Sequence, residues 1–543
     1  MRTALALLWA GRRSQRGGVL SAVLIMTAFI AIISGALMAE LSGNLLVSRT
    51  LLNRVNNEAT DNSAVEVALS QLQTTALNAP CPSTSPASVN NTTASTSYIA
   101  CWATVRESKK VTSVGGGGSQ FLVDGVHGTA NGLDDYVVGD VGGTLYDIPF
   151  GSSSPRWSVS VGSTVTATPL IIPVPGSSSR VLDVVPVESP VCGQPNCLNV
   201  LVDVPGSTNA PTAGCIAQAA GGVIQAQPGP SRTQAGLVYF AAGSTFYASD
   251  VSQSGQQQCD FESSATIPNN ELLQAQPIAL PCTKGCGGGT TEYVFTVVGA
   301  SGATHLLEWT YRKSALKLAQ SFALPWGNAS GAAFSGTASP VTMAITFGNG
   351  AVELVSVSST GNVSLGANAS TGMTVADAPY WCHCPGGDEI GVGGQNGALH
   401  LFDGSLQPIG TLSGGGSAIV TTPAADGAGN WYYGANDGYV HEVQVVQGQA
   451  YLTQVDTFGP MGATTSAVVV SGCSIGICVY LGASNDVAYL VPLDARRAII
   501  SACISTAPPA CSGANPRLWA KVAVGASGAP QAVHVEGWSY YSG

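Results

Sequence analysis

Several oxygen-bearing side chains gather between Asp124 and Asp147, early in the chain. Calcium in proteins is bound by about six to eight oxygen atoms from carboxylates, amides and carbonyls. The candidate ligands here are Asp124, Asn131, Asp134 and Asp135. Thr129 and Leu133 interrupt the alternation of acidic residues, and the alternative is that these side chains cap the turns of a hairpin. Calcium is thus the one cofactor that the sequence leaves open, and no other is predicted.

A second stretch, Cys382-His383-Cys384, offers two thiols and an imidazole in consecutive positions. Structural zinc sites need a closed tetrahedral set of ligands, usually with two cysteines spaced as Cys-x-x-Cys. The sequence contains no second compact cluster to complete such a set. We therefore predict no metal here and expect disulfides, either with separate partners or as a local ring.

The other cysteines point to the same chemistry. The chain has 14 cysteines, none before Cys81, and several form close pairs. Close pairs are typical of disulfides that staple loops in an oxidising compartment, although reduced core cysteines are the alternative. The candidates are Cys81, Cys101, Cys192, Cys197, Cys282, Cys286, Cys473, Cys478, Cys503 and Cys511. The body of the protein is therefore predicted to be extracytoplasmic.

Composition restricts the fold and the partners. Of 543 residues, 20 are Lys or Arg and 31 are Asp or Glu, which gives a net charge of −11. Such an acidic chain would repel a phosphate backbone, so nucleic acid is not expected as a partner. Hydrophobic residues make up 45% and charged residues only 9%, which argues against disorder. Abundant Gly, Ser, Thr and Val favour a mainly β body with short strands and tight turns.

The N-terminal region must position this body relative to a membrane. Residues 17–39 carry no charge, and the apolar stretch Val19–Ala39 is 21 residues long, enough to cross roughly 30 Å of hydrocarbon. Basic residues precede it, which places the N-terminus in the cytoplasm. A signal peptide is the alternative, but helical spacing of apolar residues continues through Leu45, Leu52, Val55, Val65 and Leu69 until Pro80. The sequence predicts one helix over 18–77, apolar in its first half.

This region resembles the N-terminus of type IV pilins, and in particular the PilX-type minor pilins. Gln15-Arg16-Gly17-Gly18-Val19-Leu20 is similar to the short basic leader that prepilin peptidase recognises, while Gly43-Asn44 and Ala64–Leu69 match the PilX-type pattern. The resemblance implies cleavage between Gly17 and Gly18. Ala22 stands where major pilins carry Glu, which fits a minor, tip-located or initiating subunit. A plain single-pass anchor is the alternative.

The remainder of the chain repeats. Strand, Gly-containing turn and strand recur every 42–56 residues in eight units: Tyr136–Ile148, Val181–Val204, Leu237–Asp250, Tyr293–Trp309, Met343–Val357, Glu389–Asp403, Trp431–Val445 and Cys478–Leu493. Small-residue phrases that usually end in Pro accompany them, such as Ala226-Gln227-Pro228 and Ala275-Gln276-Pro277. This period predicts a seven- or eight-bladed β-propeller; a β-sandwich is the alternative.

The opening unit resembles the first blade of the PilY-type pilus tip adhesins. An Asp/Asn-Gly-rich loop runs into the hairpin Tyr136-Val137-Val138-Gly139-Asp140, followed by Gly143-Thr144-Leu145-Tyr146, and Gln276-Pro277-Ile278 matches a phrase of that family. The resemblance implies adhesion by the propeller and, in that family, calcium binding by such loops.

No catalytic constellation is evident. Quinone-dependent dehydrogenases are propellers with a repeated Asp, Gly and Trp pattern, which Asp147, Gly151 and Trp157 fit only once. The histidines are scattered, and no nucleophile elbow occurs. We predict that the protein is not an enzyme.

The predicted organisation is a prepilin leader (1–17), a pilin-like transmembrane and amphipathic helix (18–77), a linker with a small disulfide subdomain (78–120) and a β-propeller (121–543). The expected function is that of a minor, tip-located type IV pilus component that presents the propeller for adhesion or for priming assembly. Its expected partners are other pilin subunits, a surface or host ligand, and the inner membrane before assembly at the cell surface. The alternative functions are a membrane-anchored extracytoplasmic scaffold for envelope proteins and a quinone-dependent oxidoreductase.

Overall fold

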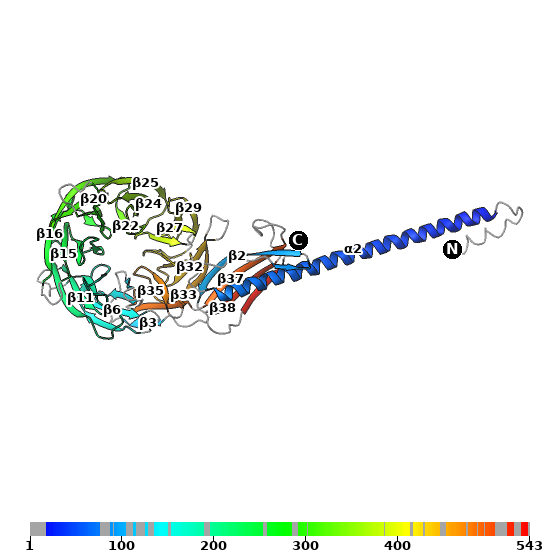
Figure 1. Ribbon diagram of the computed structural model, residues 1–543, viewed down its shortest axis with the longest axis horizontal. Helices are drawn as coiled ribbons and strands as arrows, with labels where there is room; N and C mark the ends of the chain where they lie inside the picture. The colour runs from blue at the N-terminus through cyan, green and yellow to red at the C-terminus, as the bar shows by residue number, and fades with distance from the viewer. Residues whose placement is uncertain are drawn as a thin grey trace.

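A computed structural model shows a long helix that projects from a ring-shaped β domain, with a small sheet between them (Figure 1). The structure describes residues 18–75, 87–90, 92–104, 112–115, 125–128, 135–149, 152, 154–188, 196–252, 258–284, 291–300, 302–384, 386–412, 416–426, 429–445, 452–473, 476–485, 487–493, 495–504, 518–525 and 534–540.

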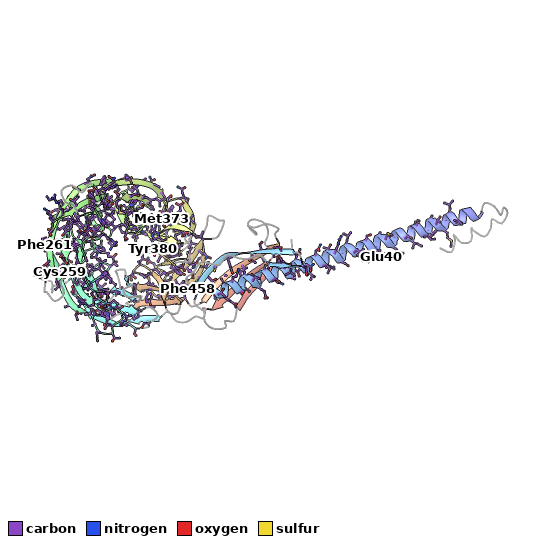
Figure 2. All side chains as sticks on the ribbon, viewed as in Figure 1. Glu40, Cys259, Phe261, Met373, Tyr380 and Phe458 are labelled. Carbon is purple, nitrogen blue, oxygen red and sulfur yellow. A yellow bond between two sulfur atoms is a disulfide. The ribbon has the colours of Figure 1, made fainter. Side chains whose placement is uncertain are left out.

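Helix α2 (Gly18–Thr74) is one continuous element of 57 residues, in agreement with the helix predicted over 18–77. Its described side chains from Val23 to Val55 are all exposed, and this part extends away from the rest of the molecule (Figure 1). At a rise of about 1.5 Å per residue, the projecting segment is about 50 Å long. Glu40 lies along this projecting part, far from the ring (Figure 2).

The C-terminal part of α2 packs against an antiparallel sheet, which we call the head sheet. Its strand order is β1-β2-β37-β38-β39. The strands are β1 (Ala87–Val89), β2 (Thr92–Thr104), β37 (Ala495–Ile504), β38 (Leu518–Gly525) and β39 (His534–Tyr540). Strands that precede the propeller in sequence and strands that follow it therefore meet in one sheet.

The helix–sheet contact is a compact apolar cluster. Val65, Ala68 and Leu72 recur at helical spacing on one face of α2 and are buried, as expected for an amphipathic segment. They pack against Tyr98 of β2 and Ile500 of β37. The Tyr98 hydroxyl also donates a hydrogen bond to the carbonyl of Ala68 (2.6 Å).

The head sheet differs from the predicted domain boundaries. Residues 78–120 were expected to form a linker and a separate subdomain, but β1 and β2 lie in the head sheet and β3 (Thr112–Gly115) lies in the ring. The last strands, expected in the propeller of 121–543, instead belong to the head sheet because β37 pairs with β2 along its length. The propeller is thus an insertion in the head sheet.

The ring is an eight-bladed propeller in the part of the chain that the structure describes. Seven blades are formed, in order, by β4 (Val126–Gly128), β5 (Asp135–Gly139), β6 (Thr144–Pro149) and β7 (Trp157–Ser160); β8 (Thr164–Val165), β9 (Leu170–Pro173), β10 (Val181–Glu188), β11 (Asn196–Asp203) and β12 (Thr212–Ala219); β13 (Gly229–Pro230), β14 (Leu237–Ala242), β15 (Thr245–Asp250) and β16 (Asp260–Thr266); β17 (Leu272–Leu273), β18 (Ile278–Pro281), β19 (Glu292–Ala300), β20 (Ala303–Arg312) and β21 (Ala315–Leu324), preceded by the short helix η3 (Pro268–Asn270); β22 (Ala329–Phe334), β23 (Val341–Phe347), β24 (Ala351–Val357) and β25 (Val363–Ser370); β26 (Tyr380–Cys384), β27 (Gly387–Gly393), β28 (Leu399–Asp403) and β29 (Pro408–Leu412); β30 (Ala424–Ala425), β31 (Trp431–Gly434), β32 (Val440–Val445) and β33 (Leu452–Phe458).

The eighth blade closes the ring with strands from both ends of the insertion. Its order is β3-β36-β35-β34, with β34 (Val469–Cys473), β35 (Gly476–Ala483) and β36 (Val487–Leu493) from the C-terminal side. A separate contact joins this blade to the first one, since Tyr136 and Tyr480 lie 5.2 Å apart by ring centroid and the Tyr480 hydroxyl donates to the Pro149 carbonyl (3.2 Å). Closure in this way protects the sheet edges.

The eight sequence repeats correspond to the central hairpins of the eight blades, from β5–β6 to β35–β36. Middle strands such as β14 are buried along their whole length, because neighbouring blades cover both faces. Outer strands such as β25 are largely exposed. This division explains why the central hairpins carry the strongest hydrophobic signal in the sequence.

The small-residue phrases mostly precede the innermost strands, and some link neighbouring blades. The Gln227 amide donates to the carbonyl of Pro169 (2.7 Å), and the Gln276 amide donates to the carbonyl of Pro228 (3.0 Å). Two further phrases of the same kind in the sequence lie elsewhere. Ala338-Ser339-Pro340 precedes a second strand, β23, and 527–530 lies outside the described residues.

Candidate functional site

The projecting half of α2 carries most of the large hydrophobic side chains that are exposed in the described chain. Its exposed side chains are large and hydrophobic, with Met26, Ile32 and Met38 each at least 69% exposed. The helix is long and apolar enough to cross a membrane, a test that some signal sequences also pass. A surface of this kind is stable only in lipid or against other apolar helices.

The head sheet and the propeller are joined by an unusual amide contact. Gln444 of β32 accepts a hydrogen bond from the Cys101 N–H (2.8 Å) through Oε1 and donates to the Cys101 carbonyl through Nε2. Strand β1 pairs with β2 only from Thr92 to Ala94. The Gln444 side chain therefore takes the place of a neighbouring strand at Cys101 and fixes the propeller to the head sheet.

Gln444 is held in turn by a buried polar network in the same blade. Its Nε2 lies 3.0 Å from Asn430 Oδ1, and Asn430 Nδ2 donates to Asp426 Oδ2 (2.8 Å). The Tyr432 hydroxyl lies 3.1 Å from both Asp426 Oδ2 and Glu442 Oε1.

The Tyr432 hydroxyl is the donor to both carboxylates, and its single proton can bond to only one of them at a time. Burial raises the pKa of Glu442 well above its usual range, and the nearby Asp426 and Asp456 charges raise it further. The surroundings of Glu442 therefore favour its neutral form.

Cys382 and Cys384 form a disulfide with each other, which is one of the two arrangements that the sequence left open. His383 lies between them and its Nδ1 is 2.7 Å from Asp388 Oδ1, on the surface. No cluster of three or more metal-binding side chains occurs among the residues that the structure describes.

The remaining cysteines also form disulfides wherever they are described. Cys101, Cys197, Cys282 and Cys478 are disulfide-bonded, and a further disulfide joins Cys215 to Cys259. The latter pair was not among the sequence candidates, because its members are 44 residues apart and lack the close spacing that was used as the signal. The side chains of Cys81, Cys192, Cys286, Cys473, Cys503 and Cys511 lie outside the described residues.

Most residues of the predicted calcium loop and leader lie outside the described residues. They are Gly17, Asp124, Asn131 and Asp134. Asp135 begins β5 and pairs through its backbone with Gly128 and Pro149, and Gly18 begins α2. Calcium binding and leader cleavage therefore stay predictions.

The acidic residues of the first hairpin have structural partners. Asp140 accepts hydrogen bonds from the Thr144 N–H (2.8 Å) and from the Tyr146 hydroxyl (3.0 Å). Asp147 pairs with Arg156 (2.9 Å) and lies opposite Trp157 across β6 and β7. These contacts stabilise the blade. They give Asp147 and Trp157, the residues that fit the dehydrogenase pattern once, a structural role.

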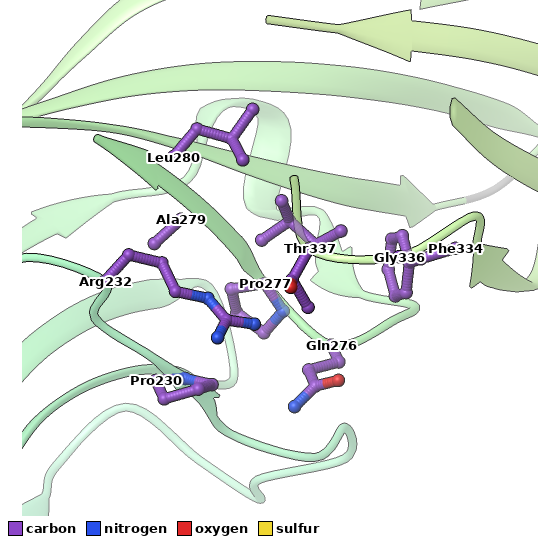
Figure 3. A pocket seen from close by; sticks show the side chains of 10 residues that line it. Pro230, Arg232, Gln276, Pro277, Ala279, Leu280, Phe334, Gly336 and Thr337 are labelled. Carbon is purple, nitrogen blue, oxygen red and sulfur yellow. The ribbon is translucent and has the colours of Figure 1, made fainter. Parts of the chain in front are cut away.

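A cavity of about 220 Å³ opens where three successive blades meet at the innermost strands. Its walls come from β13, β18 and β22, from the residues just before β18 and from the turns after β13 and β22. Apolar groups, including Pro230, Pro277 and Phe334, line most of it, and Arg232 extends along one side (Figure 3).

A second cavity of about 260 Å³ lies at the outer rim between β12 and β16. Its walls include Tyr247, Cys259 and Phe261, and Phe261 is 62% exposed. Figure 2 shows Cys259 and Phe261 on the side of the ring opposite the helix.

The fold defines a β-propeller that carries an N-terminal apolar helix. Sqt1 of Saccharomyces cerevisiae is similar in structure, with 10% sequence identity and a TM-score of 0.51, over 70% of this chain and 98% of that one. The computationally designed Ika8 protein (14% identity, TM-score 0.47) covers 70% of this chain and 98% of its own. The match to BamB from Moraxella catarrhalis (13% identity, TM-score 0.41) covers 73% of this chain and 99% of BamB. No family model and no curated protein matches the sequence.

Sequence reasoning did not identify Arg232, Gln444 or the rim cavity. Gln276 belongs to a repeated phrase, and this could have marked the channel end of its blade. Arg232 and Gln444 stand in no repeat and no motif, because their roles depend on which blades lie side by side.

Proposed function

We propose that the protein is a minor, tip-located component of a type IV pilus. In this proposal α2 packs among the helices of other pilin subunits after the leader is removed, and the propeller is presented for adhesion or for priming assembly. Before assembly the helix spans the inner membrane, and the body lies outside the cytoplasm.

The observation that carries the proposal is the division of α2 into two halves. Its described side chains from Val23 to Val55 are all exposed, whereas Val65, Ala68 and Leu72 are buried against the head sheet. The exposed segment is about 50 Å long, which exceeds the roughly 30 Å of a bilayer core. Exposed apolar residues such as Leu41, Leu45 and Leu52 continue beyond the uncharged run. The additional length supports a role in helix–helix packing beyond the membrane.

The composition around the helix start supports the same role. The uncharged run begins directly after Arg16, in the motif that resembles a prepilin leader, and the first acidic residue after it is Glu40. Ala22 leaves the helix start without a carboxylate, which suits a subunit at the end of a filament, with no preceding neighbour whose amino terminus it must neutralise.

The test is the mature N-terminus of the protein and its location in the native host. Filaments are sheared from cells, and the protein is analysed by mass spectrometry in the filament and membrane fractions. We expect a start at Gly18 in the filament fraction. A Gly17→Phe variant should retain its leader and stay in membranes, while a Gly18→Ala variant should still be cleaved and serves as the matched control.

An intact Met1 that occurs only in membranes would contradict the pilus role. The protein would then be a membrane-anchored propeller, the alternative that the apolar helix alone supports. Calcium binding near Asp124, the lack of enzymatic activity and the lack of nucleic-acid binding are proposals that rest on the sequence.

A further inference from the structure

The cavity between the innermost strands contains one cation in an acidic protein. Arg232 lies in the turn between β13 and β14 and is exposed, and its guanidinium points toward Pro277 (Figure 3). No carboxylate pairs with this guanidinium among the residues that the structure describes. An arginine without a partner, beside a cavity, is available to bind an anion from outside.

A buried carboxylate beside this turn is already bonded to other groups. Glu292 of β19 is completely buried and accepts hydrogen bonds from the Arg232 N–H (2.5 Å), the Thr233 N–H (2.7 Å), the Ser231 hydroxyl (2.8 Å) and the Tyr239 hydroxyl (2.6 Å). These four bonds hold the turn that carries Arg232. Glu292 therefore fixes the backbone of Arg232 while leaving its guanidinium free, which makes Glu292 a positioning residue.

The other polar groups of the cavity suit a ligand that also carries an amide N–H. The Gln276 amide nitrogen is engaged with the Pro228 carbonyl (3.0 Å), so its orientation is fixed and its Oε1 is the free acceptor. Thr337, in the turn after β22, adds a hydroxyl to the lining. Two of the lining residues are prolines, which have no N–H to compete for a carboxylate.

The rest of the wall is apolar, with Ile278, Leu280 and Phe334 beside the prolines. A cavity of about 220 Å³ is smaller than the roughly 300–1,000 Å³ of sites that enclose drug-sized ligands. Such a volume suits the C-terminal residue of a peptide better than an internal peptide segment, which would need room for the chain on both sides.

We propose that this cavity binds the C-terminus of a partner polypeptide that ends in an apolar residue. Arg232 pairs with the terminal carboxylate, Gln276 accepts the last amide N–H, and the apolar wall takes the side chain. The inference names a ligand class for the propeller whose tip position is proposed above. Binding is measured without filaments, so its failure would leave the filament test unaffected.

The experiment uses the full chain in detergent micelles and fluorescence polarisation. The probes are fluorescein-labelled Gly-Ser-Gly-Ser peptides extended by Leu, Phe or Val, each with a free or an amidated C-terminus. We expect at least one free-acid peptide to bind saturably, and its amide to bind about tenfold more weakly or worse, since a hydrogen bond to a charged group is lost.

Variants then locate the binding. Arg232→Gln should weaken the free-acid peptide about tenfold or more, while Arg180→Gln, an exposed arginine of another blade, should leave it unchanged. Thr337→Glu places a competing carboxylate at the wall and should also abolish binding without touching the core, because Thr337 is exposed.

Three results would overturn the proposal: no saturable binding of any free-acid peptide, equal binding of acid and amide, or unchanged binding by Arg232→Gln. An amidated peptide with an internal Asp separates the two sources of a carboxylate. If it binds as tightly as the free-acid peptides, the assignment to a C-terminus is wrong.

Discussion

Removing the Gln444 side chain should loosen the propeller from the head sheet. Gln444→Ala deletes two hydrogen bonds to Cys101 and one to Asn430, and it leaves the N–H and carbonyl of Cys101 without that partner. Each bond contributes about 0.5–1.5 kcal/mol, and unsatisfied buried groups cost more. The junction should therefore open about 2–4 kcal/mol more easily.

Hydrogen exchange measures this opening at the Cys101 amide, because that N–H donates directly to Gln444. A loss of about 2 kcal/mol should speed its exchange about 30-fold, while amides in the core of β14 should be unaffected. Gln454→Ala is the control, since Gln454 is exposed in the same blade and its hydrogen bonds go to Thr457 and to His441 of that blade. If exchange at Cys101 is the same in the variant and the wild type, Gln444 does not hold the junction, and this interpretation is wrong.

Three further predictions concern stability. Burial raises the pKa of Glu308 from 4.5 to about 7, so between these pH values the folded state binds a proton that the unfolded state has lost. The free energy of unfolding should therefore fall by up to about 3 kcal/mol as pH rises through this range. Urea unfolding at pH 5 and pH 8 should show this decrease in the wild type but not in Glu308→Gln, and the same decrease in both proteins would contradict the prediction. Leu72→Ala should lower the free energy of unfolding of the head by about 2–5 kcal/mol, measured by thermal unfolding in detergent, whereas Leu52→Ala on the exposed half should have no effect. Replacing Cys215 and Cys259 together by Ser should cost about 4 kcal/mol, because their link closes a loop of 44 residues; equal urea midpoints with and without the link would argue against this.

The propeller was predictable because its signal is repeated and local. Each central hairpin, for example Leu237–Asp250, has two buried strands joined by a tight turn, and this pattern appears eight times. The helix was predictable for a similar reason, because an uncharged run and its continuation are read from neighbouring residues. Both features depend on short-range patterns that composition and periodicity record directly.

The head sheet was not predictable in this way. Strand β2 is rich in Thr and Ser, which gave Thr92–Thr104 the composition of a linker, although Thr favours strands when a partner is present. Its partner β37 lies at the far end of the chain. The cavity at Arg232 has the same origin, since Glu292 comes from the next blade, 60 residues along the chain from Arg232. Neither arrangement leaves a pattern among residues close in sequence.

The insertion itself explains how such a distant pairing can form. Thr104 and Ala495 are direct partners in the β2–β37 ladder, separated by about 390 residues, and closing a flexible loop of that length costs about 5 kcal/mol beyond a constant. The propeller changes this cost, because β3 pairs with β36 at the end of the ring and brings Thr112 opposite Leu490. Once the ring has closed, only a few residues separate each end of the propeller from the head sheet. Pairing of β2 with β37 then closes only a short loop, so most of the loop-closure free energy has been spent in forming the ring. We therefore expect the propeller to fold first, the head sheet to form on its closed ends, and the Gln444 contact to fix the two together.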